Sequence, residues 1–183
     1  MPKETYIPIL LSLFRQYGYD GATLSKISAA TGLGKASLYH HFPGGKDDMV
    51  KAVLDHAQSW RQQNVQLPLS SEGTPQERLQ KMSDRIYELY EGGDQPCILA
   101  ILHAGSSRDV FHAQIKQVVT DWISAIAEVL KEAGLEDTVA QQRGQDALIA
   151  IQGSLIVSQA LDDTSLFLRT IEQLPQMLLD SAD

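Results

Sequence analysis

Two short helical segments joined by a glycine turn are the feature that most limits how this chain can fold. Thr23 is expected to cap the first segment, whose apolar positions Leu24 and Ile27 recur at helical spacing. A turn at 32–34 with two glycines follows, and then a second short helix at 35–41. A pair whose second helix exposes small and polar side chains is the helix-turn-helix design, which binds the major groove of DNA.

The rest of the chain also shows helical spacing of apolar residues, and no stretch alternates as a β-strand would. A capping box at 74–77, with proline at the first helical position, predicts the start of a helix that ends near Gly92. Residues 66–74 are expected to connect the two regions. We therefore expect an all-α fold of about nine helices, near residues 7–18, 23–32, 35–41, 46–60, 75–91, 97–103, 109–133, 138–161 and 164–179.

The net charge of −8 argues at first against a polyanionic partner, but the charge is unevenly distributed. Residues 1–57 carry six Lys and Arg against five Asp and Glu, a net charge of +1, so the remainder carries −9. A weakly basic head on an acidic body is compatible with DNA binding but does not by itself establish it.

Length and composition exclude several other classes of protein. A chain of 183 residues with 43% hydrophobic content can build a real core. No run approaches the roughly 18 apolar residues of a membrane helix, and residues 1–5 lack the layout of a signal peptide. Cys97 is the only cysteine, so no internal disulfide can form. We expect a cytoplasmic protein with no membrane partner.

The outer face of the second short helix carries side chains suited to DNA. Ala36 and Ser37 leave room for close approach in a groove about 12 Å wide. Lys35, Tyr39 and His40 can reach phosphates or base edges. Backbone amides at the starts of the neighbouring helices can donate to flanking phosphates. The expected DNA-binding residues are Thr23, Ser25, Lys35, Ala36, Ser37, Tyr39, His40 and Lys46.

The segment from Thr23 to Phe42, followed by Lys46, resembles the DNA-binding signature of the TetR family of transcriptional regulators. It contains a capping threonine, an alanine pair, a glycine turn and the order Leu-Tyr-His-His-Phe. About the first 60 residues share this resemblance. It implies that Tyr39 and Lys46 contact the DNA backbone, and that Lys35, Ser37 and His40 lie in the groove while Phe42 packs inside.

Two departures from the common family pattern affect these expectations. The link Pro43-Gly44-Gly45 has one glycine more than the commoner link. In this it resembles a subgroup of the family linked to drug or flavonoid response. The N-terminus lacks the basic run of many relatives, so we do not rely on contacts from an N-terminal arm in the minor groove.

The resemblance also implies a homodimer that reads a palindromic operator, because two recognition helices about 34 Å apart contact two half-sites. In the family, the last two long helices form a four-helix bundle with those of the partner. Residues 1–57 are thus expected to form the DNA-binding domain, and 58–183 the ligand-binding and dimerisation domain. The expected dimer residues are Ile149, Gly153, Ile156, Ala160, Phe167, Ile171 and Leu174.

A small-molecule pocket in the second domain should be mostly apolar with a few polar anchors. The faces that would line it show no cationic cluster, which favours a neutral or cationic aromatic effector over a multiply charged anion. Each candidate is also a reasonable core residue. The expected effector contacts are Trp60, Met82, Tyr87, Tyr90, Cys97, His103, Phe111, Trp122 and Gln152.

Other classes of function fit the sequence less well. We find no nucleophile–base pair, phosphate loop or metal-binding histidine spacing, and therefore expect no enzyme, no metal and no cofactor. A redox sensor at Cys97 would need nearby positive charge, which Asp94 and His103 do not assure. An activator, a corepressor-dependent regulator and a ligand-binding bundle without a DNA role stay open. The expected function is that of a repressor released from DNA by a small effector.

Overall fold

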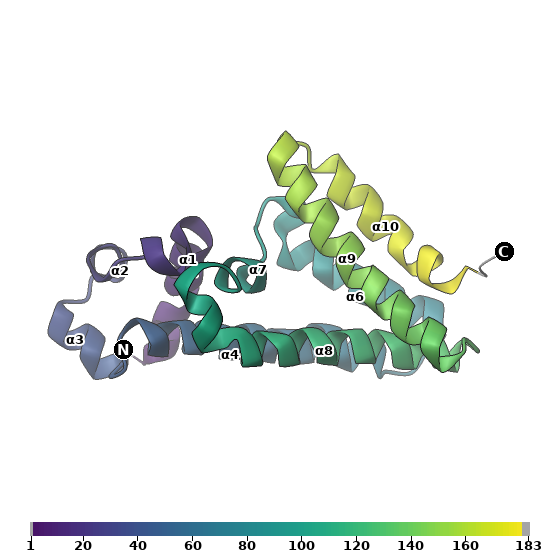
Figure 1. The fold of residues 1–183 in the computed structure, drawn as a ribbon, viewed down its shortest axis with the longest axis horizontal. Helices are drawn as coiled ribbons and strands as arrows, with labels where there is room; N and C mark the ends of the chain where they lie inside the picture. The colour runs from purple at the N-terminus through teal and green to yellow at the C-terminus, as the bar shows by residue number, and fades with distance from the viewer. Residues whose placement is uncertain (1, 181–183) are drawn as a thin grey trace. The chain divides into compact units, whose positions relative to one another are not determined.

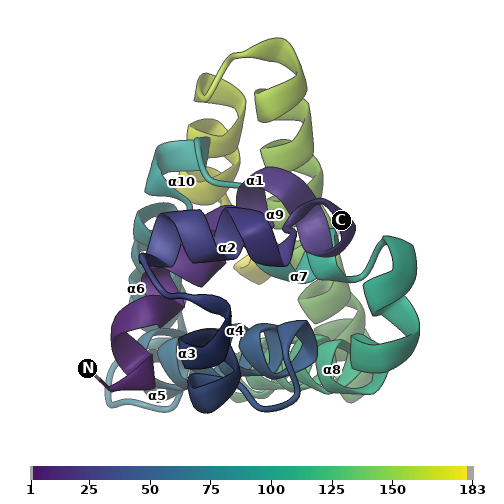
Figure 2. The same cartoon turned by 90° about the vertical axis from the view of Figure 1, so that its left-hand side faces the viewer.

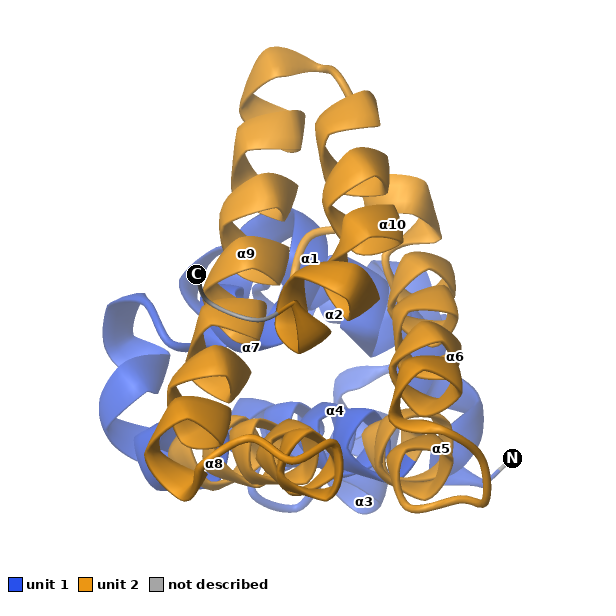
Figure 3. Ribbon diagram, turned by 90° about the vertical axis from the view of Figure 1, so that its right-hand side faces the viewer, with its two compact units in different colours: residues 1–59, 98–115 blue, residues 60–97, 116–183 orange. Residues whose placement is uncertain are grey.

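The structure is a computed structural model that describes residues 2–180 (Figure 1). Every regular element in this range is helical, so the predicted all-α class is confirmed. Ten α-helices are assigned in the described range, and nine of them have five or more residues, as expected. The chain forms two compact units, of residues 1–59 with 98–115 and of residues 60–97 with 116–183 (Figure 3).

The first unit contains the predicted helix-turn-helix. Its helices are α1 (Ile7–Gly21), α2 (Leu24–Thr31), α3 (Lys35–His41), most of α4 (Lys46–Arg61), α7 (Ile98–Leu102) and the start of α8 (Arg108–Glu132), with 3-10 turns at Lys3–Tyr6 and Gly105–Ser107. Its core consists of side chains at most 1% exposed, which include Leu10, Phe14, Ile27, Leu38, Phe42, Met49 and Val53.

Local interactions explain where the first helices begin and end. The Thr23 hydroxyl accepts a hydrogen bond from the Lys26 amide at 3.3 Å and so caps α2, as predicted. Gly32 ends α2 in the left-handed conformation, with φ of 69°. Gly18 was expected to end the first helix. The long part of α1 does end there, because Gly18 has non-helical torsion angles (φ 63°, ψ −178°), and a short helical turn follows this kink and ends at Gly21.

The second unit is a helical bundle. Its elements are the end of α4, a π-helical turn (Gln62–Gln66), α5 (Leu67–Leu69), α6 (Pro75–Leu89), a 3-10 turn (Glu91–Gly93), the rest of α8, α9 (Asp137–Leu161) and α10 (Ser165–Leu179). Helix α10 packs against both α9 and α6, and α9 and α10 run side by side (Figure 1). The core includes Leu79, Met82, Ile86, Ile126, Leu130, Ile151, Leu155 and Phe167.

The capping box at the start of α6 is confirmed. The Thr74 hydroxyl accepts from the Glu77 amide at 3.2 Å, and the Glu77 carboxylate accepts from the Thr74 amide at 2.8 Å. The hydrogen bonds that the Thr74 amide and hydroxyl donate to this carboxylate lower the pKa of Glu77. Two of the otherwise unpaired amides at the helix start are thereby satisfied.

The expected connection at 66–74 is wrong in its first part, because helical structure continues to Leu69. Residues 62–66 form a π-helical turn in which the Leu67 amide donates to the Gln62 carbonyl. Leu67 separates this wider turn from Pro68, which has no amide hydrogen to continue an α-helical ladder. The sequence pattern of Pro68, Ser70 and Ser71 therefore led to a predicted end of the helical structure that is too early.

Helices α8 and α9 approach closely at Gly144. A Cβ atom at this position would lie 2.7 Å from the carbonyl oxygen of Ile123. Only glycine therefore fits here without displacing backbone, although glycine in a helix interior costs about 1 kcal/mol relative to alanine.

Candidate nucleic-acid interface

The exposed face of α3 holds all five side chains predicted to contact DNA from this helix. Leu38, which is 1% exposed, fixes α3 to the core of the first unit. Tyr39 is 42% exposed, so this aromatic ring lies on the outer face of α3 and not in the core. The exposed residues are Lys35, Ala36, Ser37, Tyr39 and His40.

A groove of about 450 Å³ lies between α2 and α3, which face the viewer in Figure 2. It brings together Ser25, Lys35 and Tyr39, three of the predicted DNA contacts. Ser28 and Ala29 also line it and were not predicted. Their signal in the sequence is a helical step from Ser25, because residues three and four positions apart share a helix face.

Thr23 has less to offer DNA than expected. Its amide donates to the Gly21 carbonyl at 3.0 Å, and its hydroxyl oxygen accepts from Lys26. The hydroxyl proton is the donor that this residue can still direct toward a phosphate.

Lys46, the first residue of α4, is half-buried against the end of α1. Its Nζ donates to the Tyr19 carbonyl at 2.8 Å and lies 4.2 Å from the centroid of the Tyr19 ring. The Tyr19 hydroxyl donates to Asp47, and burial together with this hydrogen bond raises the pKa of Tyr19 to about 12. The sequence gave no indication that Tyr19 belongs to this cluster.

The structure explains in different ways why glycine occupies the two positions before α4. The Gly44 amide donates to the Asp48 carboxylate at 2.6 Å, and a Cβ at Gly44 would lie 2.6 Å from the same carboxylate. Gly45 has φ of 67°, and a Cβ there would lie 3.5 Å from the Tyr39 ring. The two glycines thus leave room for the Asp48 carboxylate beside the Gly44 amide and for the Tyr39 ring beside Gly45.

Seven of the nine expected effector contacts lie in the second unit. Met82, Tyr90, Cys97 and Trp122 are buried, Trp60 and Gln152 are half-buried and Tyr87 is exposed. The Gln152 amide donates to the Tyr90 hydroxyl at 3.3 Å. Gln152 Oε1 and Trp122 Nε1 are buried without a hydrogen-bond partner among the described residues. Such atoms are suitable polar anchors for a bound molecule.

The other two expected effector contacts, His103 and Phe111, belong to the first unit. His103 is exposed and its ring lies 5.4 Å from that of His112. Phe111 is 5% exposed and packs against the Tyr19 ring, with centroids 6.3 Å apart. Phe111 thus contributes to the packing around Lys46.

Arg61 is a buried cation that sequence reasoning missed. It is 5% exposed, and its Nη2 lies 3.6 Å from the Asp121 carboxylate. Its Nε and Nη1 have no hydrogen-bond partner within residues 2–180. The signal was present in the helical phase, because Arg61 lies seven positions after the buried Leu54. A single buried cation is not the cationic cluster whose absence was expected, but it adds a charged donor to the interior of the second unit.

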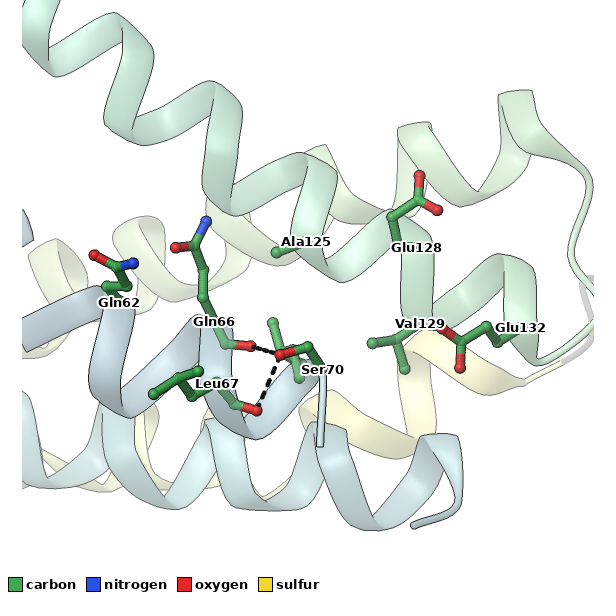
Figure 4. A pocket seen from close by; sticks show the side chains of 9 residues that line it. Gln62, Gln66, Leu67, Ser70, Ala125, Glu128, Val129 and Glu132 are labelled. Carbon is green, nitrogen blue, oxygen red and sulfur yellow. Dashed lines mark hydrogen bonds between the residues drawn. The ribbon is translucent and has the colours of Figure 1, made fainter. Parts of the chain in front are cut away.

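A separate groove of about 390 Å³ in the second unit lies between residues 62–70 and the C-terminal half of α8 (Figure 4). The Ser70 hydroxyl on its wall donates to the carbonyls of Gln66 and Leu67. None of the expected effector contacts lines it. Its lining is Gln62, Gln66, Leu67, Leu69, Ser70, Ala125, Glu128, Val129 and Glu132.

Four of the expected dimer residues form an exposed stripe on α9, and three do not. Ile149, Gly153, Ile156 and Ala160 are exposed, and Val157 and Leu161 extend the stripe. The expectation for α10 needs correction because its residues point into the core of their own unit. Phe167, Ile171 and Leu174 are 0%, 3% and 1% exposed. Helix α10 uses this apolar face against α9 and α6.

No described helix is long and apolar enough to cross a membrane. Within the same part of the chain, no group of three or more His, Cys, Asp or Glu side chains could hold a metal ion. Cys97 is a buried free cysteine.

A short exposed helix after a capped helix and a glycine turn defines a helix-turn-helix transcriptional regulator. Comparison with models of known families supports this assignment as a helix-turn-helix regulator. The family model "Bacterial regulatory proteins, tetR family" matches residues 11–53, and the model "Transcriptional regulator LmrA/YxaF-like, C-terminal domain" matches residues 75–173. The chain belongs to the TetR family and carries a C-terminal domain of the LmrA/YxaF type.

Individual relatives match nearly the whole chain, in sequence or in fold. The HTH-type transcriptional regulator LmrA of Bacillus subtilis (strain 168) is 21% identical over 180 residues, which cover 96% of each protein. A TetR regulator from Legionella pneumophila has 20% identity, 96% coverage of each chain and a TM-score of 0.82. The regulator CifR, solved with a 26-base-pair operator, has 16% identity, 94% coverage of each chain and a TM-score of 0.77.

Proposed function

We propose that this regulator is a repressor that binds a palindromic operator as a homodimer and leaves it when a small, mostly apolar effector binds. The observation that carries the proposal is the exposed polar face of α3 beside Lys46, whose ammonium is fixed at the end of α1. Base contacts come from Lys35, Ser37 and His40, and phosphate contacts from Tyr39 and Lys46. Thr23, Ser25 and Ala36 complete the interface.

In this proposal, residues 1–57 bind DNA, and residues 58–183 bind effector and dimerise. The α9 stripe supports dimerisation, because Ile149 and Ile156 are 68% and 60% exposed. Large apolar side chains in a contiguous exposed patch are typical of interaction surfaces. The dimer surface consists of Ile149, Gly153, Ile156, Val157, Ala160 and Leu161.

The effector would contact buried aromatic groups of the second unit and a few polar anchors. The free donors of Arg61 and Trp122 favour a molecule that carries acceptor oxygens on an aromatic body. The Pro43-Gly44-Gly45 link supports membership of the subgroup linked to drug or flavonoid response. Release follows if the effector binds more tightly to a dimer geometry in which the two α3 helices have the wrong spacing.

The decisive experiment is fluorescence anisotropy of the purified protein with DNA that flanks its own gene, over a series of salt concentrations. We expect tight, palindrome-dependent binding that weakens steeply with salt. Tyr39→Ala should abolish most of it, and Lys46→Met should lower the salt slope by about one. Lys51→Met is the matched control, because Lys51 lies on α4 but pairs with Asp55 at 2.6 Å.

Other results would favour the other classes. Binding that strengthens with an added metabolite would indicate a corepressor-dependent regulator, and reporter expression that rises with operator occupancy would indicate an activator. If selection from a whole-genome library also yields no sequence-dependent binding, the chain acts as a ligand-binding bundle without a DNA role.

A further inference from the structure

Lys46 occupies a position in α4 that is unfavourable for a cation. It is the first residue of the helix, where the macrodipole places partial positive charge. Asp47 and Asp48 in the same turn are the usual choice there. A lysine at this point therefore needs compensation from elsewhere in the fold.

The compensation comes from the end of α1. The Tyr19 carbonyl, two residues before the last residue of α1, accepts from Lys46 Nζ at 2.8 Å. This carbonyl lies in the short turn that follows the kink at Gly18, and its oxygen is an acceptor for the ammonium. The same ammonium lies 4.2 Å from the Tyr19 ring centroid, within the range of a cation–π interaction. A lysine ammonium has three N–H donors, so two remain for other acceptors.

The Tyr19 ring is itself held on two sides. Its hydroxyl donates to Asp47, the residue after Lys46. It packs against the Phe111 ring at the start of α8, with ring centroids 6.3 Å apart and the ring planes at 62°. Next to it, Asp20 accepts hydrogen bonds from the amide and hydroxyl of Ser106. The ring thus has little freedom to leave Lys46.

We propose that Tyr19 is a positioning residue for DNA binding, which holds the Lys46 ammonium where its two remaining donors meet a phosphate. A lysine side chain has a long flexible stem, and its order must be established before or during binding. Tyr19 establishes this order in the free protein. The inference rests on the proposed function, in which Lys46 contacts the DNA backbone.

The test is a double-mutant cycle between Tyr19→Leu and Lys46→Met, measured by anisotropy with a fluorescein-labelled duplex from the DNA that flanks the gene. Tyr19→Leu should weaken binding roughly two- to fivefold, the size of a cation–π contact. In the Lys46→Met background it should have no further effect. Tyr19→Phe keeps the ring and should bind within about twofold of the wild type.

Tyr17→Leu is the matched control, because the Tyr17 ring lies 3.7 Å from the Nζ of Lys26 in the same kind of contact on the same helix. The effect of Tyr17→Leu on DNA binding should be the same in the wild-type and in the Lys46→Met background. Melting temperatures of all variants separate misfolding from loss of contact, since a folding defect weakens binding in both backgrounds.

The outcomes distinguish this inference from the proposed function. If the wild-type protein does not bind DNA with a salt dependence, the proposed function fails and the inference fails with it. If the wild type binds but the effects of Tyr19→Leu and Lys46→Met are additive, only the role of Tyr19 is overturned. If Lys46→Met has no effect, the phosphate contact of Lys46 is overturned together with the role of Tyr19, while DNA binding by the protein stands.

Discussion

The Arg61 guanidinium lies 3.6 Å from the Asp121 carboxylate, with Arg61 5% exposed and Asp121 at the edge of solvent. Burial lowers the pKa of Arg61, and the charge of Asp121 opposes this shift. Asp121 is therefore the counterion of a desolvated cation.

Asp121→Asn should destabilise the protein by roughly 1–3 kcal/mol, because it leaves a buried charge without its partner. Asp121→Asn combined with Arg61→Met should recover most of this loss, since no charge then remains buried. Urea unfolding gives the free energy of unfolding of the single and the double variant and so measures both the loss and the recovery. Asp55→Asn, which breaks an exposed pair with Lys51, is the control and should change stability by less than about 1 kcal/mol. Equal losses at the two sites would mean that Arg61 is well solvated.

The capping box gives a second prediction. Thr74→Ala should cost about 1 kcal/mol, because the Glu77 amide loses its acceptor. The melting temperature should fall by roughly 2–4 °C. Thr164→Ala is the control, because Thr164 stands at the same position before α10 but makes no side-chain capping hydrogen bond. If the two variants melt alike, the cap at Thr74 contributes nothing measurable.

The α9 stripe gives a third prediction. Ile156→Glu should convert a dimer to folded monomers, since a charge in the centre of an apolar interface is left without a partner. Sedimentation velocity measures the mass and circular dichroism the helical content. Val110→Glu changes a side chain of similar exposure, 55% against 60%, far from α9 in the sequence, and should leave the mass unchanged. A dimer that persists in Ile156→Glu would place the interface on another surface.

The Asp20–Ser106 contact gives a prediction of pH dependence. Hydrogen bonds from Ser106 lower the pKa of Asp20 below its ordinary 3.8. The stabilisation is therefore fully present above pH 3.8 and is lost as the pH falls through the lowered value. Ser106→Ala should return the pKa of Asp20 toward 3.8, as measured by NMR titration of the carboxyl carbon. Asp163, whose pKa is lowered by Ser165, should not change and is the internal control.

Much of the fold could be predicted from the sequence because its signals are local. Thr23 and Thr74 cap helices through their own neighbours, and Gly32 ends α2 through its own backbone conformation. The outer face of α3 follows from the helical phase of Leu38 alone. Such features depend on residues within one or two helical turns.

The features that sequence reasoning missed depend on contacts between distant segments. Tyr19 contacts Lys46 and Phe111, which lie 27 and 92 positions further along the chain. The sequence around Tyr19 predicts neither contact. Phe167 is as apolar as any interface residue, and only the packing of α10 on α9 and α6 decides that it faces inward. Residues 98–115 join the first unit for the same reason.

The contact between Gly144 and Ile123 limits how the second unit can deform. A shift of α9 along α8 by one helical turn would bring the Cβ of Ala140 or Leu148, which lie four positions away on the same face of α9, toward the carbonyl that now faces Gly144. Sliding is therefore costly, whereas rotation about this point keeps the backbones in contact. We expect α9 to rotate relative to α8 about the contact at Gly144 and not to slide along it.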